Sequence, residues 1–322
     1  MNGVKKVIGV DAGGSKTLAL LVSESGEVLG RMLTGGANPR SVGQSAAAEA
    51  LREALAPLLQ RPVAGICVGA AGLARASDRE FFETAIREVA GPTVPVLLCN
   101  DAQIALEAGA SERPAMVVIA GTGSLVYGER ADRTPVRCGG YGAVLGDPAS
   151  GYALGLSALR HAARSLDGLE PRGRLADAVL MSADATSVPE LVAKVHHWPP
   201  DIGAIAALAS LVSDAAAQGD EAAKTIVDTA CSEFREHVAL VASRVRTPAE
   251  LPVVIWGGAF EAVPELVEAV REAAYSTGPC SVGRASLEPA HGAAFLALGS
   301  LGVIRGQRST VELQGSGGAS QP

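Results

Sequence analysis

The spacing of apolar positions changes along this chain, and each change predicts where a strand gives way to a turn or a helix. Two short apolar runs predict buried strands over Val7–Val10 and Leu18–Val22, and a third strand begins at Val28. Apolar residues then recur every 3.6 positions, which predicts a helix over 42–59. The first segment therefore reads as a strand hairpin followed by a helix, the start of an α/β domain.

Two more apolar runs follow, and both end in residues suited to a ligand site. The run at 64–73 predicts a strand that ends in small residues, and PVLLC at 95–99 predicts a strand followed by Asn100 and Asp101. Ser77 is the expected N-cap of the helix between these strands, with acidic residues in its first turn. Ligands of open α/β sheets sit at the carboxyl ends of strands, so Asp101 is a candidate site residue.

The second part of the chain repeats the pattern of the first. The segment Ala115–Gly128 again reads as strand, glycine turn and strand, and Leu251–Phe260 as a buried strand with a Gly-Gly turn. Helices are expected from near Asp147 to Ser165, over much of 173–246, and from Pro289. We expect domains at 1–113 and 114–289, with a helix at 290–305 that packs back on the first domain. The Gly/Ser-rich tail at 306–322 is expected to be flexible.

Length, charge and cysteine usage narrow the class of protein. A chain of 322 residues favours two domains over one core. Its net charge of −7 argues against nucleic acid or an anionic membrane as a partner, and we expect neither. The start of the chain has no signal-peptide core, and no apolar run is long enough to span a bilayer. The scattered cysteines form neither a disulfide framework nor a zinc pattern, which favours the cytoplasm; they are Cys67, Cys99, Cys138, Cys231 and Cys280.

The turn DAGGSKT, between the first two strands, is the first candidate for chemistry. Asp11 lies where the first strand ends, and Gly13 and Gly14 let the backbone come close to a ligand. Backbone N–H groups of such a turn form a concavity suited to phosphate. The helix-based phosphate loop is absent, since GxxxxGK[ST] does not occur and a strand follows the turn. An ordinary Gly-Gly hairpin turn is the alternative. The segment resembles the first phosphate motif of the actin, Hsp70 and sugar-kinase superfamily.

Five motifs taken together extend this resemblance to almost the whole chain, residues 4–303. DAGGSKT, the Asn100-Asp101 pair, AGTGS at 120–124, LGDPASGYALG and WGGAF stand in the order found in bacterial N-acetylglucosamine kinase-like proteins. These form part of the BadF/BadG/BcrA/BcrD ATPase family. The resemblance implies an α/β fold of two ribonuclease H-like, actin-like ATPase domains with a cleft between them. It also implies a homodimer and transfer of the ATP γ-phosphate to the 6-hydroxyl of an amino sugar, N-acetylglucosamine or glucosamine.

On the nucleotide side, the resemblance and phosphoryl-transfer chemistry assign three glycine turns and one carboxylate. Phosphoryl transfer needs the phosphates held and Mg²⁺ to neutralise charge. Asp11 is the expected Mg²⁺ residue, acting through water, with turn capping as the alternative. A plain strand-to-helix turn is equally open for the Gly-Gly pair at 257–258. The expected ATP contacts are Gly13, Gly14, Ser15, Lys16, Thr17, Gly121, Thr122, Gly123, Gly257, Gly258 and Ala259.

On the sugar side, Asp101 is the expected catalytic base, and helix capping is its alternative role. The other expected sugar contacts are Asn38, Gly72, Thr122 and Asp147. Asn38 also suits a turn before proline, and Asp147 before Pro148 also suits a helix start. Pro148 departs from the family pattern, because GDPAS stands where GDEGS is usual. The missing glutamate leaves the identity of the sugar open among N-acetylglucosamine, glucosamine, N-acetylmuramic acid and rarer amino sugars.

Two other functions of the same fold remain as alternatives. Activator ATPases of radical dehydratases bind an iron–sulfur cluster through a cysteine near the second phosphate motif. No cysteine lies around Gly121–Ser124, and Cys138 stands in a different context. A sugar sensor without kinase activity would usually carry a DNA-binding segment, which the sequence before the first strand does not suggest. An actin-like polymerising protein would normally be longer.

Overall fold

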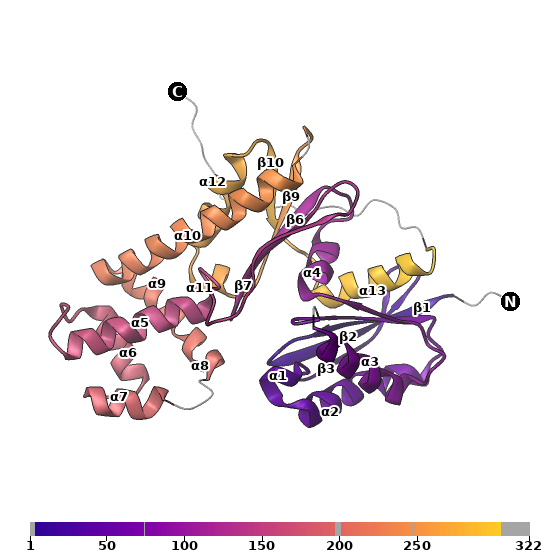
Figure 1. The fold of residues 1–322 in the computed structure, drawn as a ribbon, viewed down its shortest axis with the longest axis horizontal. Coiled ribbons are helices and arrows are strands. Elements are labelled where there is room, and N and C mark those ends of the chain that lie inside the picture. The colour runs from indigo at the N-terminus through magenta and orange to yellow at the C-terminus, as the bar shows by residue number, and fades with distance from the viewer. Residues whose placement is uncertain (1–3, 74, 197–200, 247, 304–322) are drawn as a thin grey trace. The chain divides into compact units, whose positions relative to one another are not determined.

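The described part of the chain forms two compact units, each built on its own sheet. The computed structural model describes residues 4–73, 75–196, 201–246 and 248–303. Residues 4–112 and 284–303 form unit 1, and residues 113–283 form unit 2 (Figure 1). Each unit contains a five-stranded sheet with helices packed on it, which confirms the predicted α/β class. The tail expected at 306–322 lies outside the described residues.

The sheet of unit 1 is mixed. Its strands run in the order β3-β2-β1-β4-β5, with β1 paired antiparallel to β2 and parallel to β4. This arrangement puts the carboxyl ends of β1, β4 and β5 at one edge, beside the turn between β1 and β2. The strands are β1 (Lys6–Ala12), β2 (Lys16–Ser23), β3 (Val28–Gly35), β4 (Gly65–Ala70) and β5 (Val96–Cys99).

Alternation along β1 separates the two faces of this sheet. Ile8 and Val10 belong to the core that includes residues of α2 and α3, whereas Val7 packs with α4 and α13. A Cβ at Gly9 would lie 2.2 Å from the carbonyl oxygen of Ala290, so only glycine lets α13 pack this closely. Figure 1 shows α13 beside α4. The helices of unit 1 are α1 (Pro39–Val42), α2 (Gln44–Leu55), α3 (Ala76–Ala90), α4 (Asp101–Gly109) and α13 (Pro289–Ser300), with a 3₁₀ turn η1 (Leu58–Gln60).

The sheet of unit 2 repeats the first in topology. Its order, β8-β7-β6-β9-β10, places a hairpin and a third strand on one side and two later strands on the other, as in unit 1. The duplication seen in the sequence pattern is therefore present in the fold. The strands are β6 (Ala115–Ala120), β7 (Ser124–Glu129), β8 (Pro135–Gly139), β9 (Leu251–Trp256) and β10 (Cys280–Arg284). Sequence reasoning did not predict β8 or β10, each of which has five residues.

The helices of unit 2 share one apolar core with its sheet. They are α5 (Gly151–Leu166), α6 (Arg174–Ser182), α7 (Val188–Val195), α8 (Ile202–Ala207), α9 (Ala209–Ala217), α10 (Glu221–Val245), α11 (Ala259–Ala262) and α12 (Glu265–Tyr275). No single helix in the described residues has the length and apolar character to cross a membrane. By those two criteria alone, one pair bent by 117° passes, Ile202–Ala217 with Glu221–Val245.

Three predicted helix boundaries were wrong, and each has a local cause. The helix expected over 42–59 is broken at Gly43, whose φ of +84° ends α1 before α2 begins. Helix α3 follows Arg75, so Ser77 lies inside it and is not its cap. Helix α5 starts at Gly151 with Ser150 as its cap, because Ala149 has a left-handed φ of +60° that ends the 147–149 segment. Asp147 is therefore not a helix cap.

Candidate functional site

The first glycine turn is closed by its own backbone. Gly13 N donates to the carbonyl of Lys16 at 3.0 Å, which joins β1 to β2 as a tight hairpin. Ser15 and Lys16 are exposed, whereas Thr17 is fully buried in β2 and its Oγ1 has no hydrogen-bond partner. The turn thus presents exposed backbone and a lysine at the end of the hairpin, an arrangement that suits an anion.

A second loop packs directly on this turn. The amides of Ala37 and Asn38 both donate to the carbonyl of Gly13, at 3.0 and 3.2 Å. A Cβ at Gly36 would lie 2.1 Å from the carbonyl oxygen of Gly14, so the two backbones touch. Asn38 is therefore held next to the predicted phosphate turn. Its side chain also caps α1 by accepting from Arg40 N at 3.0 Å.

Asp11 and Asp101 lie together at the carboxyl edge of the unit 1 sheet. Asp11 is the second-last residue of β1, on the face that α13 and α4 cover, and Asp101 is the first residue of α4. Burial raises the pKa of Asp11 to about 6, with the charges of Asp101 and Glu288 adding to the rise and that of Lys16 opposing it. Two carboxylates, from β1 and from the start of α4, are thus close enough for each to feel the other's charge.

Asp101 does not cap its helix, contrary to the alternative raised from the sequence. Asn100 is the N-cap of α4: its side chain accepts from Gln103 N at 2.7 Å, and the Gln103 side chain accepts from Asn100 N. Asp101 Oδ1 accepts from the next amide, Ala102 N, at 3.0 Å. Because the reciprocal capping box already satisfies the helix start, the helix does not depend on Asp101 as its cap.

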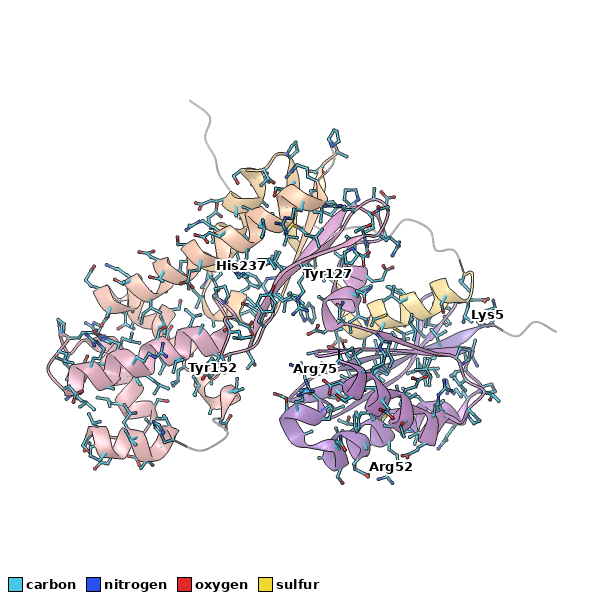
Figure 2. All side chains as sticks on the ribbon, viewed as in Figure 1. Lys5, Arg52, Arg75, Tyr127, Tyr152 and His237 are labelled. Atoms are coloured by element: carbon cyan, nitrogen blue, oxygen red, sulfur yellow. The ribbon has the colours of Figure 1, made fainter. Side chains whose placement is uncertain are left out.

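The second glycine turn, in unit 2, is held from two sides. Gly121 N donates to Gly123 O at 2.8 Å, and Gly121 O accepts from Gly151 N, at the start of α5, at 2.7 Å. Tyr152 N, in the same first helical turn (Figure 2), donates to the carbonyl of Thr122 at 3.3 Å. On the other side, a Cβ at Gly257 would lie 2.3 Å from the carbonyl oxygen of Ala120. The turn is therefore fixed before any ligand arrives.

Gly257 must be glycine for a second reason. Its φ is +118°, a conformation that side chains rarely adopt, whereas Gly258 has open space at the Cβ position. Ala259 is buried at the start of the four-residue α11. The predicted nucleotide turn at 257–259 thus touches the predicted phosphate turn at 121–123, and both lie at the carboxyl edge of the unit 2 sheet.

Asp147 lies beside this second turn. A Cβ at Gly123 would be 2.8 Å from its Oδ2, and its Oδ1 accepts from Gly142 N at 3.1 Å. Burial raises the pKa of Asp147, while hydrogen bonds from the backbone of Gly142, Ser124 and Tyr141 act in the opposite direction. The carboxylate therefore orders the glycine-rich loop before it and remains next to Thr122 and Gly123.

Two ion pairs near the unit 1 site were not predicted from the sequence. Glu288, the N-cap of α13, accepts a two-pronged bond from Arg31, and its charge reaches Asp11. Asp78 forms a similar pair with Arg40, beside Gly72. Neither could have been found from strand-end position, because both pairs join residues far apart in the chain. Gly72 itself lies in an exposed turn with φ of +88°.

The acidic side chains at the unit 1 site are oxygen ligands of the kind that bind Mg²⁺. Among the described residues, no group of three or more His, Cys, Asp or Glu side chains could hold a metal ion. Mg²⁺ usually keeps several waters and is shared between one or two carboxylates and substrate phosphates. Asp11 and Asp101 supply hard oxygen atoms, and a cation near them would relieve the repulsion that raises the pKa of Asp11. The residues therefore fit an ion that arrives with a nucleotide and is held by Asp11 through water.

Comparison with known proteins identifies the family. The BadF/BadG/BcrA/BcrD ATPase family matches residues 8–297. The chain belongs to this family. This confirms the resemblance drawn from the five motifs, and two matched proteins of known name align with most of the chain.

Both of those relatives of this BadF/BadG/BcrA/BcrD family member are kinases. An N-acetyl-D-glucosamine kinase of Dictyostelium discoideum is 28% identical over 315 residues, which cover 91% of this chain and 98% of that protein. An N-acetylmuramic acid/N-acetylglucosamine kinase of Clostridium acetobutylicum is 31% identical over 237 residues, 72% of this chain and 77% of that protein. The chain is accordingly an enzyme of the ATP-dependent kinase class.

Solved structures confirm the fold of this family member. A candidate N-acetylglucosamine kinase from Chromobacterium violaceum superposes with a TM-score of 0.73 at 25% identity, covering 91% of this chain and 99% of that one. A ROK family glucokinase from Streptomyces griseus, solved with glucose and AMPPNP, gives 0.58 at 20% identity, covering 91% and 99%. The second likeness concerns the fold alone. The two-domain, actin-like architecture predicted from the sequence is thus confirmed.

Phosphate binding can be tested at the second glycine turn by a substitution that does not disturb the fold. A Cβ at Gly13 would lie 2.7 Å from Lys16 O, so a side chain there would disturb the hairpin itself. The Cβ position of Gly121 has nothing within 4 Å. Gly121→Val should therefore leave folding unchanged. It should weaken ATP binding about tenfold or more, because the valine side chain would keep a phosphate oxygen away from the turn and so remove one charge-assisted hydrogen bond to ATP.

Isothermal titration calorimetry measures this effect, and Gly299→Val is the matched control. Gly299 lies in the exposed end of α13, also with nothing within 4 Å of its Cβ position. ATP affinity should stay at the wild-type value in this control. An equal ATP affinity in folded Gly121→Val protein would show that this turn does not approach the phosphates.

Proposed function

We propose that this enzyme transfers the γ-phosphate of ATP to the 6-hydroxyl of an amino sugar, N-acetylglucosamine or glucosamine. The observation that carries the proposal is the pair Asp11 and Asp101, placed beside an exposed glycine turn at the carboxyl edge of the unit 1 sheet. Sugar kinase activity, the broader part of the proposal, is supported by relatives that align with most of the chain. The choice of an amino sugar follows their names.

In this proposal Asp101 is the base that accepts the proton of the sugar hydroxyl. Asn100 fixes the start of α4, so the carboxylate of the next residue has a defined position. Phosphoryl transfer has a loose transition state, so the carboxylate mainly orients the hydroxyl and takes its proton late. The family resemblance assigns the remaining sugar contacts to Asn38, Gly72, Thr122 and Asp147.

The glycine turns would hold the nucleotide. In our proposal the turns at 13–17 and 121–123 bind the phosphates, and the turn at 257–259 leaves room for adenosine. Mg²⁺ held by Asp11 through water would neutralise charge on the phosphate oxygens during transfer. Before that, the exposed Ser15 and Lys16 of the first turn would attract and orient the anion.

We also propose that the enzyme is cytoplasmic and acts as a homodimer. No disulfide joins the five cysteines, all of which lie in the described part of the chain, and four of them are buried. Cysteines that stay out of disulfides are typical of a reducing compartment, which supports a cytoplasmic location. The proposal of a homodimer rests on the family resemblance.

A coupled assay with a panel of sugars tests the reaction and its position. ADP release is measured with N-acetylglucosamine, glucosamine, N-acetylmuramic acid and glucose, and with 6-deoxy-N-acetylglucosamine as the control that lacks the acceptor. We expect the highest kcat/KM with N-acetylglucosamine or glucosamine and no turnover of the 6-deoxy sugar. Faster turnover of glucose would remove the amino-sugar specificity, and turnover of the 6-deoxy sugar would move the transfer to another hydroxyl.

A further inference from the structure

A two-pronged ion pair joins two separate loops of unit 1. Arg40 Nε donates to Asp78 Oδ2 at 2.8 Å, and Arg40 Nη2 donates to Asp78 Oδ1 at 2.9 Å. The Asp78 side chain is only 10% exposed, whereas that of Arg40 is 50% exposed. Arg75, labelled in Figure 2, adds a weaker contact, with its Nη1 3.8 Å from Asp78 Oδ2. The planar fork of arginine fits both carboxylate oxygens, a match that lysine cannot make.

The arginine end of this pair belongs to the loop that carries Asn38. Arg40 lies two residues after Asn38, and its amide donates to the Asn38 side chain. The same loop touches the first phosphate turn through Ala37 N and Asn38 N, which donate to Gly13 O. Helix α1 has four residues, too few to be stable through its own hydrogen bonds. Its position therefore depends on contacts such as that of Arg40.

The aspartate end belongs to the segment that follows β4. Asp78 lies in the first turn of α3, and the turn at Gly72 packs on its carboxylate: a Cβ at Gly72 would lie 3.1 Å from Oδ2. Arg75 N also donates to Gly72 O at 3.1 Å. One carboxylate thus contacts the Gly72 turn on one side and the Asn38 loop, through Arg40, on the other.

We propose that Arg40 and Asp78 form a positioning pair that holds Asn38 and the Gly72 turn in the geometry for sugar binding. This inference rests on the proposed function, in which both residues contact the sugar. Neither member of the pair is assigned a contact with the reacting atoms. The pair acts by fixing two loops relative to each other and to the phosphate turn, because its two hydrogen bonds run from one loop to the other.

Steady-state kinetics of four variants test this inference: Arg40→Ala, Arg40→Lys, Asp78→Asn and the Arg40→Ala/Asp78→Asn double variant. A misplacement of about 1 Å in a positioning group costs about 100-fold, so the KM for the sugar should rise about 10- to 100-fold in each. The value of kcat and the KM for ATP should stay within a few-fold of wild type. The double variant should be no worse than the worse single variant, because one interaction is lost in every case.

A matched control and a second measurement separate positioning from general stability. Arg87→Ala breaks the exposed pair with Glu83 on the same helix as Asp78, 3.1 Å long, and should leave the sugar KM unchanged. Amide hydrogen exchange at Ala37 and Asn38 should become faster in Arg40→Lys while the melting temperature stays close to wild type. This measurement needs no sugar, so it holds even if the wild-type enzyme accepts none of the panel and the proposed function fails.

Three results would overturn the inference. One is an unchanged sugar KM in folded Arg40→Lys and Asp78→Asn proteins. Another is a severe loss in Arg40→Ala with none in Asp78→Asn, because Arg40 would then act on a ligand directly. The third is unchanged amide exchange at Ala37 and Asn38 in Arg40→Lys.

Discussion

Replacing Asp101 by Asn should lower kcat by about 10²- to 10⁴-fold, the range typical of a lost general base, while the protein stays folded and still binds ATP. The amide keeps the shape of the carboxylate but cannot accept the proton of the sugar hydroxyl. The measurement is kcat with the preferred sugar, together with the melting temperature and ATP affinity of the same preparation.

The structure separates the effect of this substitution on turnover from its effect on folding. Asn100 caps α4 through its reciprocal bond with Gln103, so Asp101 is not needed to start the helix. The loss of a negative charge in the first helical turn costs only about 0.3–1 kcal/mol. Removal of that charge also relieves its repulsion of Asp11. Stability and turnover are therefore expected to change independently.

A crossed control uses the neighbouring cap. Asn100→Ala should lower the free energy of unfolding by about 1 kcal/mol, the usual cost of a lost N-cap, with a much smaller fall in kcat. Asp101→Asn, in contrast, is expected to lower kcat strongly and to change the free energy of unfolding little. If the folded Asp101→Asn enzyme turned over at close to the normal rate, Asp101 would not be the base, and Asp147 would be the next candidate.

Replacing Asp11 by Asn should abolish most activity and yet stabilise the protein at neutral pH. The amide would weaken the hold on Mg²⁺, and loss of a single electrostatic group of this kind typically lowers kcat about 10²- to 10³-fold. The free energy of unfolding should rise because the ionised carboxylate is destabilised by burial and by repulsion from the charge of Asp101. Kinetics at several Mg²⁺ concentrations and thermal unfolding across pH measure the two effects.

The sign of the stability change follows from the direction of the pKa shift. The pKa of Asp11 rises from 3.8 to about 6 in the folded protein, so the folded state binds the proton more tightly than the unfolded state. The destabilising effect is thus absent below pH 3.8, grows as pH rises to 6, and is complete above it. A shift of this size corresponds to about 3 kcal/mol at most, and the partial exposure of Asp11 reduces it to about 1–3 kcal/mol.

Asp11→Asn should therefore raise the melting temperature at pH 7.5 and change it little at pH 4.5. Glu27→Gln is the control for the loss of one exposed negative charge in the same unit, and it should have little effect at either pH. The kcat/KM for ATP of the wild-type enzyme, which reports ionisation of the free enzyme, should fall as pH falls through about 6, because Asp11 becomes protonated. A lower melting temperature of Asp11→Asn at pH 7.5 would contradict the prediction that the ionised Asp11 carboxylate destabilises the folded protein.

Sequence by itself determined the strands and turns that carry the candidate site. The strands around Val7–Val10, Leu18–Val22 and 95–99 were located because burial on both faces demands continuous apolar runs, which local sequence displays. The two glycine turns were located because glycine marks close backbone approach. The repeated strand–turn–strand pattern also predicted the two hairpins, β1–β2 and β6–β7, although β8 and β10 of the second sheet were not predicted. These features depend on residues close together in the chain.

Tertiary structure alone decided which residues meet. The start of α5 at Gly151 depends on the left-handed Ala149, and the break between α1 and α2 on the left-handed Gly43; a 3.6-residue period does not report such backbone angles. The pair Arg40–Asp78 joins residues 38 positions apart, and the pair Arg31–Glu288 joins residues 257 positions apart. No local pattern in the sequence predicts such pairs. The raised pKa of Asp11 likewise comes from burial and from charges on other elements. Local sequence encodes where backbone can bend or be buried, whereas charge and contact depend on the folded chain.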